Sequence, residues 1–213
     1  MAENDIEIFA EVGTGSLLPG GRAGIRLRRT WQSRQEAFAR SILDKTGHDA
    51  ESLDEALADD EQLADIFVKA LGRASSTSEP FYRAALANLV AAALDKTTTI
   101  DVADALIDHL LRLDIAAMRL LYGIYEPRDA PDLAHGRHIH FSVASALRAQ
   151  PNETLVEPAL AQLRAAGFIE QAVDVMTSIE RSDAQSDVDI SYDRTSWGEQ
   201  AFTLCRMHET PPD

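Results

Sequence analysis

The chain has one cysteine in 213 residues, Cys205, so it cannot form an internal disulfide. Proteins of the reducing cytoplasm typically lack disulfides. The longest apolar run, residues 84–94, contains Asn88 and is too short to span a bilayer. The first ten residues, "MAENDIEIFA", lack the basic and apolar segments of a secretory signal. We therefore expect a cytoplasmic protein without a membrane span.

Catalytic and cofactor motifs are also missing. There is no G-x-S-x-G, phosphate-binding loop or dinucleotide fingerprint. The histidines of "HGRHIH", residues 135–140, place at most two side chains on one helix face, with no carboxylate or cysteine in register for zinc. The aspartates of residues 183–189 lack the glycine and closing glutamate of a calcium loop. Cys205 has only His208 near it and is expected to pack inward. We expect no enzymatic activity, cofactor or metal.

Positive charge is scarce overall but concentrated in one segment. The chain has 20 basic and 35 acidic residues, a formal net charge of −15. This balance disfavours non-specific attraction of the whole molecule to nucleic acid or to an anionic membrane. Six arginines nevertheless lie between Arg22 and Arg40, where Glu36 is the one acidic residue. One short segment is therefore strongly positive on an acidic molecule.

This basic segment follows residues 1–24, whose glycines and Pro19 predict a flexible arm. From about residue 25 to residue 43 the pattern is that of an amphipathic helix. At 100° per residue, apolar side chains fall within about 60° of one another: Leu27, Trp31, Phe38 and Ile42. Four basic side chains fall on the opposite side: Arg22, Arg26, Arg29 and Arg40.

The arginine face has more than one interpretation. The simplest is a solvated surface that balances acidic helices of the same molecule or of a second subunit. Two functional alternatives stay open, namely docking to an acidic partner protein and contact with anionic lipid or nucleic acid. The apolar stripe either packs on the core or forms a dimer seam. The candidate partner-binding residues are Arg22, Arg26, Arg29, Arg40 and Trp31.

Helical patterns continue as far as residue 126. Ser52 and Glu55 have the spacing of a capping box and predict the start of a short helix. Apolar residues recur with helical spacing over residues 63–71. Pro80 suits the start of a nearly all-apolar helix that we place at the centre of the core. Two more helices follow, and the pattern predicts a helical, bundle-like domain over residues 25–126.

Residues 127–138 are rich in Pro, Gly and Asp and mark the predicted domain boundary. After this loop the expected order is helix, turn, helix, β-hairpin and closing helix. These elements fall at residues 139–149, 153–166, 168–178, 188–194 and 196–205. The order is typical of a winged-helix-like domain, here over residues 138–208.

The helix expected over residues 153–166 stands where many winged helices read DNA. A reader helix needs Arg, Lys, Asn or Gln at base edges and cations on the flanking phosphates. This helix begins with Glu153, Thr154 and Glu157, and Arg164 lies near its far end. The expected hairpin carries seven carboxylates against two arginines. These charges disfavour DNA and favour a structural or protein-docking role.

Four segments together match the pattern of a known family: "FYRAALANLVAAALD" at 81–95, "DALIDHLLRLDIAAMRLLYGIY" at 104–125, "LRAAGFIE" at 163–170 and "YDRTSWGEQAFTLC" at 192–205. Through these segments, residues 55–206 resemble the Abi-alpha family of bacterial proteins, named after abortive infection. Arg112 and Leu113 stand where the family pattern has serine and proline. The resemblance implies a helical half, a winged-helix-like half and a link to phage defence, and it assigns no catalytic residue.

We therefore predict a mainly α protein with a bundle-like N-terminal half and a winged-helix-like C-terminal half that contains a β-hairpin. The function expected is that of a non-enzymatic protein-interaction module in phage defence or stress response, whose partner is another protein or a second copy. One alternative is a DNA-binding regulator that uses the winged helix or the basic helix 22–40. The other is a membrane-peripheral protein anchored by that basic helix.

Overall fold

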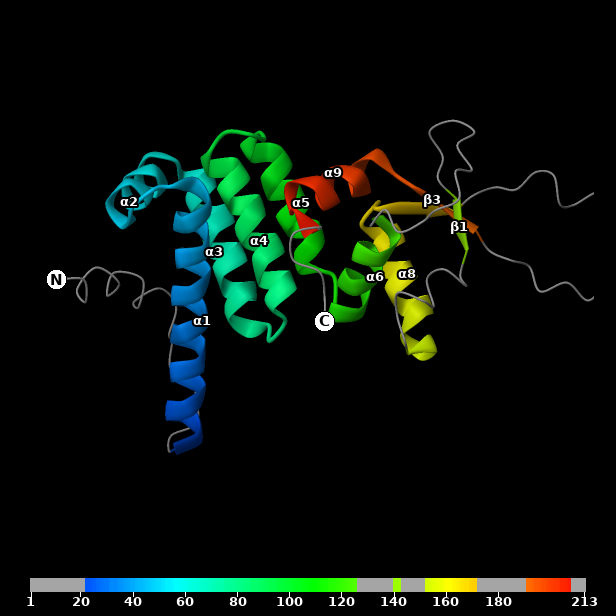
Figure 1. Cartoon of the computed structure of the whole chain (residues 1–213), viewed down its shortest axis with the longest axis horizontal. Coiled ribbons are helices and arrows are strands. Elements are labelled where there is room, and N and C mark those ends of the chain that lie inside the picture. Colours follow the sequence, from blue (N-terminus) through cyan, green and yellow to red (C-terminus); the bar gives the residue numbers. More distant parts are fainter. Residues whose placement is uncertain (1–21, 126–139, 143–151, 172–190, 208–213) are drawn as a thin grey trace, which may run out of the picture. The chain divides into compact units, whose positions relative to one another are not determined.

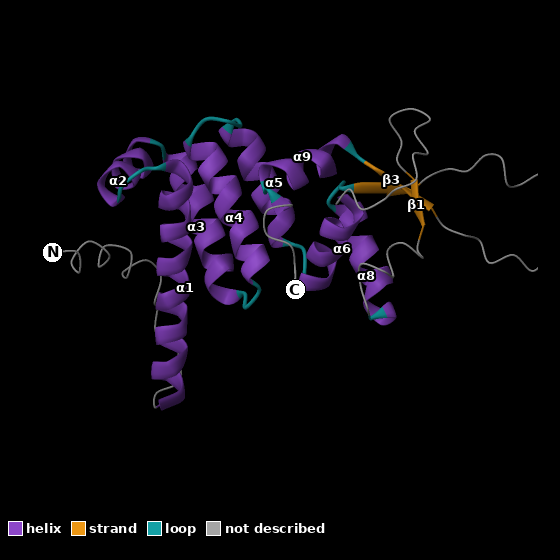
Figure 2. Cartoon of the chain, in the orientation of Figure 1, coloured by secondary structure: helices purple, strands orange, loops and turns teal. Residues whose placement is uncertain are grey.

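A computed structural model describes residues 22–125, 140–142, 152–171 and 191–207 of the chain. The described residues are mainly helical, as predicted, with one small antiparallel sheet (Figures 1 and 2). The chain divides into two compact units, Met1–Ile107 and Asp108–Asp213. The boundary predicted from the sequence, residues 127–138, lies outside the described residues.

The first unit consists of helices, and α5 continues from it into the second unit. α1 packs on α3 and α4, α3 packs on α4, and α2 packs on α3. The predicted arm over residues 1–24 lies outside the described residues except for its last three, which belong to the first turn of α1. The helices are α1 (Arg22–Thr46), α2 (Ala50–Asp59), α3 (Glu61–Ser76), α4 (Pro80–Leu94) and α5 (Ile100–Leu111).

The most apolar helix, α4, supplies much of the core of the first unit, as predicted. Pro80 occupies its first turn, where a missing backbone N–H costs nothing. Leu86 and Leu89 are fully buried. The C-terminal half of α1 completes this core through Phe38 and Ile42, which are 2% and 0% exposed. The ring of Phe38 lies 6.2 Å from that of Phe67 on α3.

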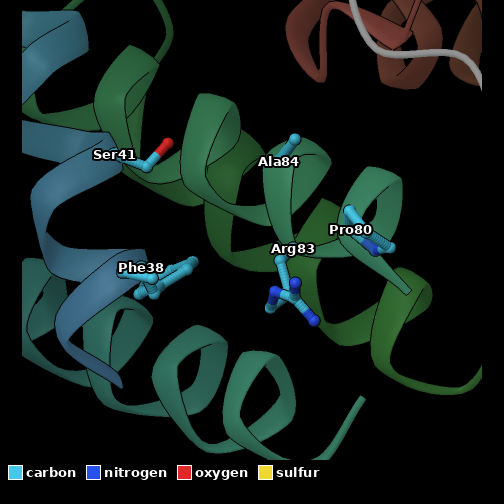
Figure 3. Close-up of a pocket in the computed structure, with 6 residues that line it drawn as sticks. Phe38, Ser41, Pro80, Arg83 and Ala84 are labelled. Atoms are coloured by element: carbon cyan, nitrogen blue, oxygen red, sulfur yellow. The ribbon is translucent and has the colours of Figure 1, made fainter. Parts of the chain in front are cut away.

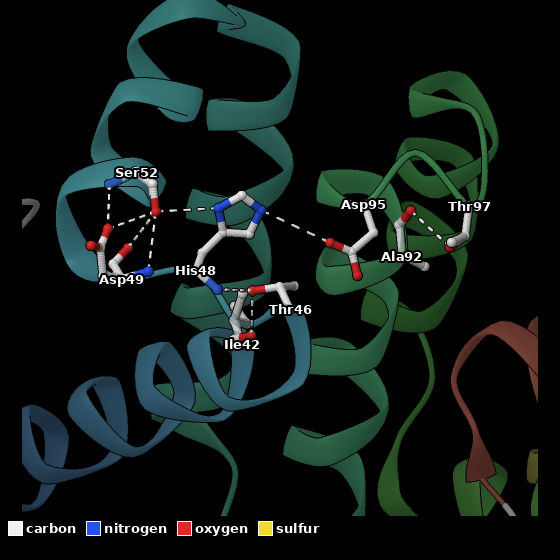
Figure 4. Close-up of polar contacts among 8 residues, drawn as sticks. All are labelled: Ile42, Thr46, His48, Asp49, Ser52, Ala92, Asp95 and Thr97. Atoms are coloured by element: carbon white, nitrogen blue, oxygen red, sulfur yellow. Dashed lines mark hydrogen bonds and ion pairs between the residues drawn. The ribbon is translucent and has the colours of Figure 1, made fainter.

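The connection from α1 to α2 is held by local hydrogen bonds (Figure 4). Gly47, with φ +71°, ends α1 in the left-handed region that glycine favours. Asp49 caps α2 because its carboxylate accepts the Ser52 backbone N–H at 2.9 Å. The Ser52 hydroxyl accepts the Asp49 N–H at 3.1 Å, which completes a capping box. The predicted box of Ser52 with Glu55 is wrong, because the helix begins at Ala50 and Ser52 is its third residue.

The second unit combines helices with a three-stranded sheet. The strand order is β1-β3-β2, and β3 pairs antiparallel with both neighbours, His140 opposite Asp193 and Ile169 opposite Arg194. α8 and α9 both pack on α6. The elements are α6 (Ile115–Tyr125), β1 (His140–Ser142), the short 3₁₀ helix η2 (Glu153–Leu155), α8 (Val156–Ala165), β2 (Ile169–Gln171), β3 (Ser191–Arg194) and α9 (Ser196–Leu204).

The strand β1 corrects one sequence prediction. Residues 139–149 were expected to form a helix, but residues 140–142 are extended because they pair with β3, about fifty positions away in the sequence. The remaining residues of that expected helix, 143–149, lie outside the described residues. Gly167 is the predicted glycine that ends α8, with φ +72°.

Tyr125, at the end of α6, joins three parts of the second unit. Its hydroxyl donates to the Phe168 carbonyl at 2.6 Å and accepts the Thr195 backbone N–H at 3.0 Å. The Thr195 hydroxyl in turn donates to the Gly167 carbonyl at 2.7 Å and accepts the Gly198 N–H at 3.0 Å, which caps α9. A side chain at Gly198 would collide with the Tyr125 hydroxyl and the Phe168 carbonyl. Burial raises the pKa of Tyr125.

Removing the Tyr125 hydroxyl is expected to destabilise the second unit. Tyr125→Phe leaves the Thr195 N–H and the Phe168 carbonyl without this partner, at a cost of about 1–3 kcal/mol in the free energy of unfolding. Urea unfolding followed by tryptophan fluorescence, in a Trp31→Phe background so that Trp197 alone reports, measures this cost. The control Ser196→Ala changes an exposed neighbour and should cost less than about 0.5 kcal/mol. A Tyr125→Phe value as small as the control would contradict the assignment.

The capping box predicts a pH effect on the first unit. Hydrogen bonds from the backbone and the side chain of Ser52 lower the pKa of Asp49 from its usual 3.8. The charged Asp49 carboxylate therefore stabilises the fold above pH 3.8. This stabilisation disappears as the pH falls through the pKa of Asp49 in the folded protein, which is lower than 3.8. Asp49→Asn keeps an oxygen acceptor but loses the charge.

The melting temperature of Asp49→Asn should therefore lie below that of the natural chain at neutral pH and approach it in acid. Thermal melts followed by circular dichroism, from neutral pH to below pH 3.8, measure the difference. Asp54→Asn, on an exposed position of the same helix, is the control for a general loss of negative charge. If the melting temperatures of Asp49→Asn and the natural chain differ by the same amount at every pH, the result would contradict the capping role of the charge.

Candidate functional site

The N-terminal half of α1 is exposed where its residues are described. Figure 1 shows this half extending past the ends of α3 and α4. Residues 29–33 are all exposed, and Trp31 is 42% exposed. The predicted apolar stripe therefore packs on the core at Phe38 and Ile42 but not at Trp31, because α3 and α4 do not reach that far. The side chain of Leu27 lies outside the described residues.

The predicted arginine face has two members whose side chains are described, Arg29 and Arg40. Both are exposed, as expected. Neither forms an ion pair with any carboxylate in the described part of the chain. Arg22 and Arg26 belong to the first turns of α1, and their side chains lie outside the described residues. The described acidic helices therefore do not neutralise this face through direct contacts.

An open cleft lies beside the C-terminal half of α1, between α1 and α4 (Figure 3). It has a volume of about 170 Å³. Figure 3 shows Phe38 and Ser41 on the α1 side and Pro80, Arg83 and Ala84 on the α4 side. Ala37 of α1 completes the lining. The cleft is mostly apolar, with one guanidinium group and one hydroxyl.

Two arginines meet beside this cleft. Arg34, one helical turn before Phe38, donates from Nη1 to the Ser75 carbonyl at 3.1 Å. Arg83 donates from Nη1 to the Thr77 carbonyl at 3.0 Å. These carbonyls belong to the C-terminal end of α3 and the residue after it, where the helix dipole favours cations. Burial, and then the charge of Arg34, lower the pKa of Arg83, while Glu79 opposes them.

The arginine pair retains capacity for an anionic ligand. A guanidinium group has five N–H donors. Within the described residues, Arg34 and Arg83 each make one hydrogen bond and neither forms an ion pair with a carboxylate. A carboxylate at this position would relieve the repulsion between the two cations. The adjoining cleft would accept a small apolar group next to that carboxylate.

Sequence reasoning missed both of these arginines. Arg34 carried a usable signal, because it stands four residues before Phe38 and therefore on the same helix face. Arg83 carried none, because its neighbour Arg34 is 49 positions away and only the packing of α1 on α4 brings them together.

The surface of α8 does not resemble a DNA reader. Its exposed residues include a single cation, Arg164, and a carboxylate, Glu157. The one amide side chain, Gln162, is already engaged. It donates to the Asp114 carboxylate at 2.8 Å and accepts the Asp114 backbone N–H at 2.9 Å. The helix therefore offers few groups that could recognise base edges.

Other sequence candidates contribute no site within the described residues. His135, His138 and the aspartates 183–189 lie outside them, and no group of three metal-binding side chains occurs in the described parts. Cys205 is fully buried, which confirms that it packs inward. Burial raises the pKa of its thiol from 9.0 to about 12, which suppresses the thiolate that a nucleophile requires.

Comparison of the chain with family models, with curated proteins and with solved structures finds no match. The Abi-alpha resemblance stays a prediction. No helix among the described residues is long and apolar enough to cross a membrane.

The buried thiol of Cys205 is expected to be inert in the folded protein. A pKa of about 12 lowers the thiolate fraction at neutral pH by about a thousandfold. Ellman's reagent should therefore react with the folded chain at least about a hundredfold more slowly than with the chain unfolded in urea. Thr203→Cys in a Cys205→Ala background places a thiol at an exposed position of the same helix and should react rapidly. Equal rates for the two thiols would contradict the burial of Cys205.

Proposed function

We propose that the protein is a non-enzymatic interaction module that binds acidic, partly apolar protein segments through α1 and its cleft. The surface concerned, called here the α1 docking surface, comprises Trp31, Arg34, Phe38 and Arg83. One observation carries the proposal. Two guanidinium groups lie together at an open apolar cleft, and neither pairs with a described carboxylate.

Several features favour a protein segment over a nucleic acid. A short segment contacts only its immediate surroundings, because charges are screened beyond about 8 Å at physiological ionic strength. An extended polyanion would also meet the rest of a molecule whose formal charge is −15. In the same unit, Glu51, Asp54 and Glu55 are exposed on α2. The apolar cleft and exposed Trp31 suit amino-acid side chains better than a phosphate backbone.

For the second unit we propose a winged helix that makes protein contacts. The three described strands form one antiparallel sheet, in which β1 precedes α8 in the sequence while β2 and β3 follow it. The order α6, β1, α8, β2, β3 and the sheet order β1-β3-β2 support this proposal. The engaged Gln162 and the exposed Glu157 of α8 favour a protein partner over DNA.

The resemblance of residues 55–206 to the Abi-alpha family extends the proposal to its setting. In that setting the module acts in the bacterial cytoplasm, in phage defence or stress response. Recognition of an acidic segment on another protein would couple the module to its partner without chemistry of its own.

A peptide selection tests the proposed function directly. Random twelve-residue peptides are selected on the immobilised full chain, and the best are measured in solution by fluorescence anisotropy. We expect the selected peptides to combine Asp or Glu with Leu, Ile or Phe. Arg34→Ala together with Arg83→Ala should weaken them at least about tenfold, because charge-assisted hydrogen bonds contribute about 1.5–3 kcal/mol each. Arg40→Ala, at an exposed site that does not line the cleft, should change the affinity less than about twofold.

The same variants distinguish the alternatives. Duplex DNA and phosphatidylserine vesicles are offered to the full chain at low and physiological salt. If the full chain binds DNA more tightly than every selected peptide, the result would contradict the proposal and support a DNA-binding regulator. Tighter binding of the vesicles than of every selected peptide would likewise support a membrane-peripheral protein. Selected peptides without carboxylates, or peptides insensitive to the double substitution, would also contradict the proposal.

A further inference from the structure

The chain carries its own segment of the kind that the α1 docking surface would bind. Residues 3–12, "ENDIEIFAEV", contain no basic residue. Carboxylates stand at four positions: Glu3, Asp5, Glu7 and Glu11. Apolar side chains stand among them: Ile6, Ile8, Phe9 and Val12. We propose that this segment occupies the α1 docking surface in cis and competes there with the partner. The inference rests on the proposed function and adds its regulation.

The segment is close enough along the chain to reach the cleft. Nine residues, 13–21, separate it from the first residue of α1. Nine residues span at most roughly 30 Å when extended. The rise of α1 from Arg22 to Phe38 is about 24 Å at about 1.5 Å per residue. A segment that runs back along α1 therefore reaches Phe38 and Arg83.

The charges along this path are complementary. Between Arg22 and Arg40 the chain has six arginines and Glu36. Arg34 lies one helical turn before Phe38, and Arg83 lines the cleft, whereas Arg29 is on the opposite side of α1. Carboxylates of the segment that reach the cleft would lie near the guanidinium groups of Arg34 and Arg83, within the range of an unscreened interaction. The apolar side chains between them match the cleft and Trp31.

The size of the cleft favours a short segment over a second copy. A stable interface between two proteins buries about 1,200–2,000 Å² in total. The cleft of about 170 Å³ accepts only one or two side chains. Residues 208–213, "HETPPD", are a poorer match, because they carry only Glu209 and Asp213 and no large apolar side chain.

Tethering makes even a weak contact effective. A connection as short as nine residues gives an effective concentration in the millimolar range. If the free segment binds with a Kd of about 0.1 mM, the tethered segment would occupy the surface in about ten molecules for every molecule whose surface is open. The partner would consequently bind about tenfold more weakly than it does to an open surface. The contact therefore sets a threshold that only a tighter or more concentrated partner crosses.

The test measures binding of a free copy of the segment to the full chain. The probe is a fluorescein-labelled synthetic peptide of residues 1–13, followed by fluorescence anisotropy. Binding is compared between the natural chain and a full-length variant with Glu3→Gln, Asp5→Asn, Glu7→Gln and Glu11→Gln. We expect the neutralised variant to bind the peptide about tenfold more tightly, because its surface is open. Adding Arg34→Ala and Arg83→Ala to the neutralised variant should abolish this gain.

A matched control separates local competition from net charge. Four exposed carboxylates of α2 are neutralised instead, by Glu51→Gln, Asp54→Asn, Glu55→Gln and Asp59→Asn. This control should leave the affinity of the natural chain for the peptide within about twofold. An equal gain in the control would overturn the contact in cis, since general repulsion would then explain the effect.

The remaining outcomes separate the inference from the proposed function. Equal, Arg83-dependent binding of the peptide to the natural and neutralised chains would overturn occupancy in cis and leave the docking surface standing. No binding to the neutralised chain would also overturn the inference. In that case the proposed function stands or falls with the peptides selected from the random library. If neither the peptide of residues 1–13 nor any peptide from the random library binds, both the contact in cis and the proposed function would be overturned.

Discussion

The C-terminal end of α3 holds two like charges together, and the proposed docking surface depends on this arrangement. The carbonyls of Ser75 and Thr77 each accept a hydrogen bond from one guanidinium group, Arg34 and Arg83 respectively. Without these acceptors the two cations would repel and separate. The helix end thus fixes α1 beside α4 and maintains an excess of positive charge at the cleft that Phe38 lines.

The same packing explains why half of α1 remains available. α1 has 25 residues, whereas α3 and α4 have 16 and 15, and its N-terminal half extends past their ends (Figure 1). Phe38 and Ile42 anchor the helix in the core, and Trp31 stays exposed. In the second unit Tyr125 plays the comparable anchoring part, because it joins α6 to the turns before β2 and α9.

Local patterns predicted the helices well, since period and capping residues are properties of neighbouring positions. The apolar helix over residues 81–94 lies in the core as expected. The prediction failed for residues 140–142, where pairing with distant β3 decides the conformation. The sequence left open whether Trp31 packs on the core, because the lengths of other helices decide its exposure. Arg29 and Arg40 of the predicted basic face are exposed, as expected. The pairing of Arg34 with Arg83 was not predicted, because no local pattern records how two helices pack.

A charge exchange tests the central claim most directly. The chain with the neutralised N-terminal segment receives Arg34→Glu and Arg83→Glu, and a peptide of residues 1–13 receives lysine at its four acidic positions. If the arginine pair recognises carboxylates, the lysine peptide should bind the exchanged chain at least about tenfold more tightly than it binds the neutralised chain that keeps both arginines. Equal affinity of the lysine peptide for both chains would contradict the docking surface.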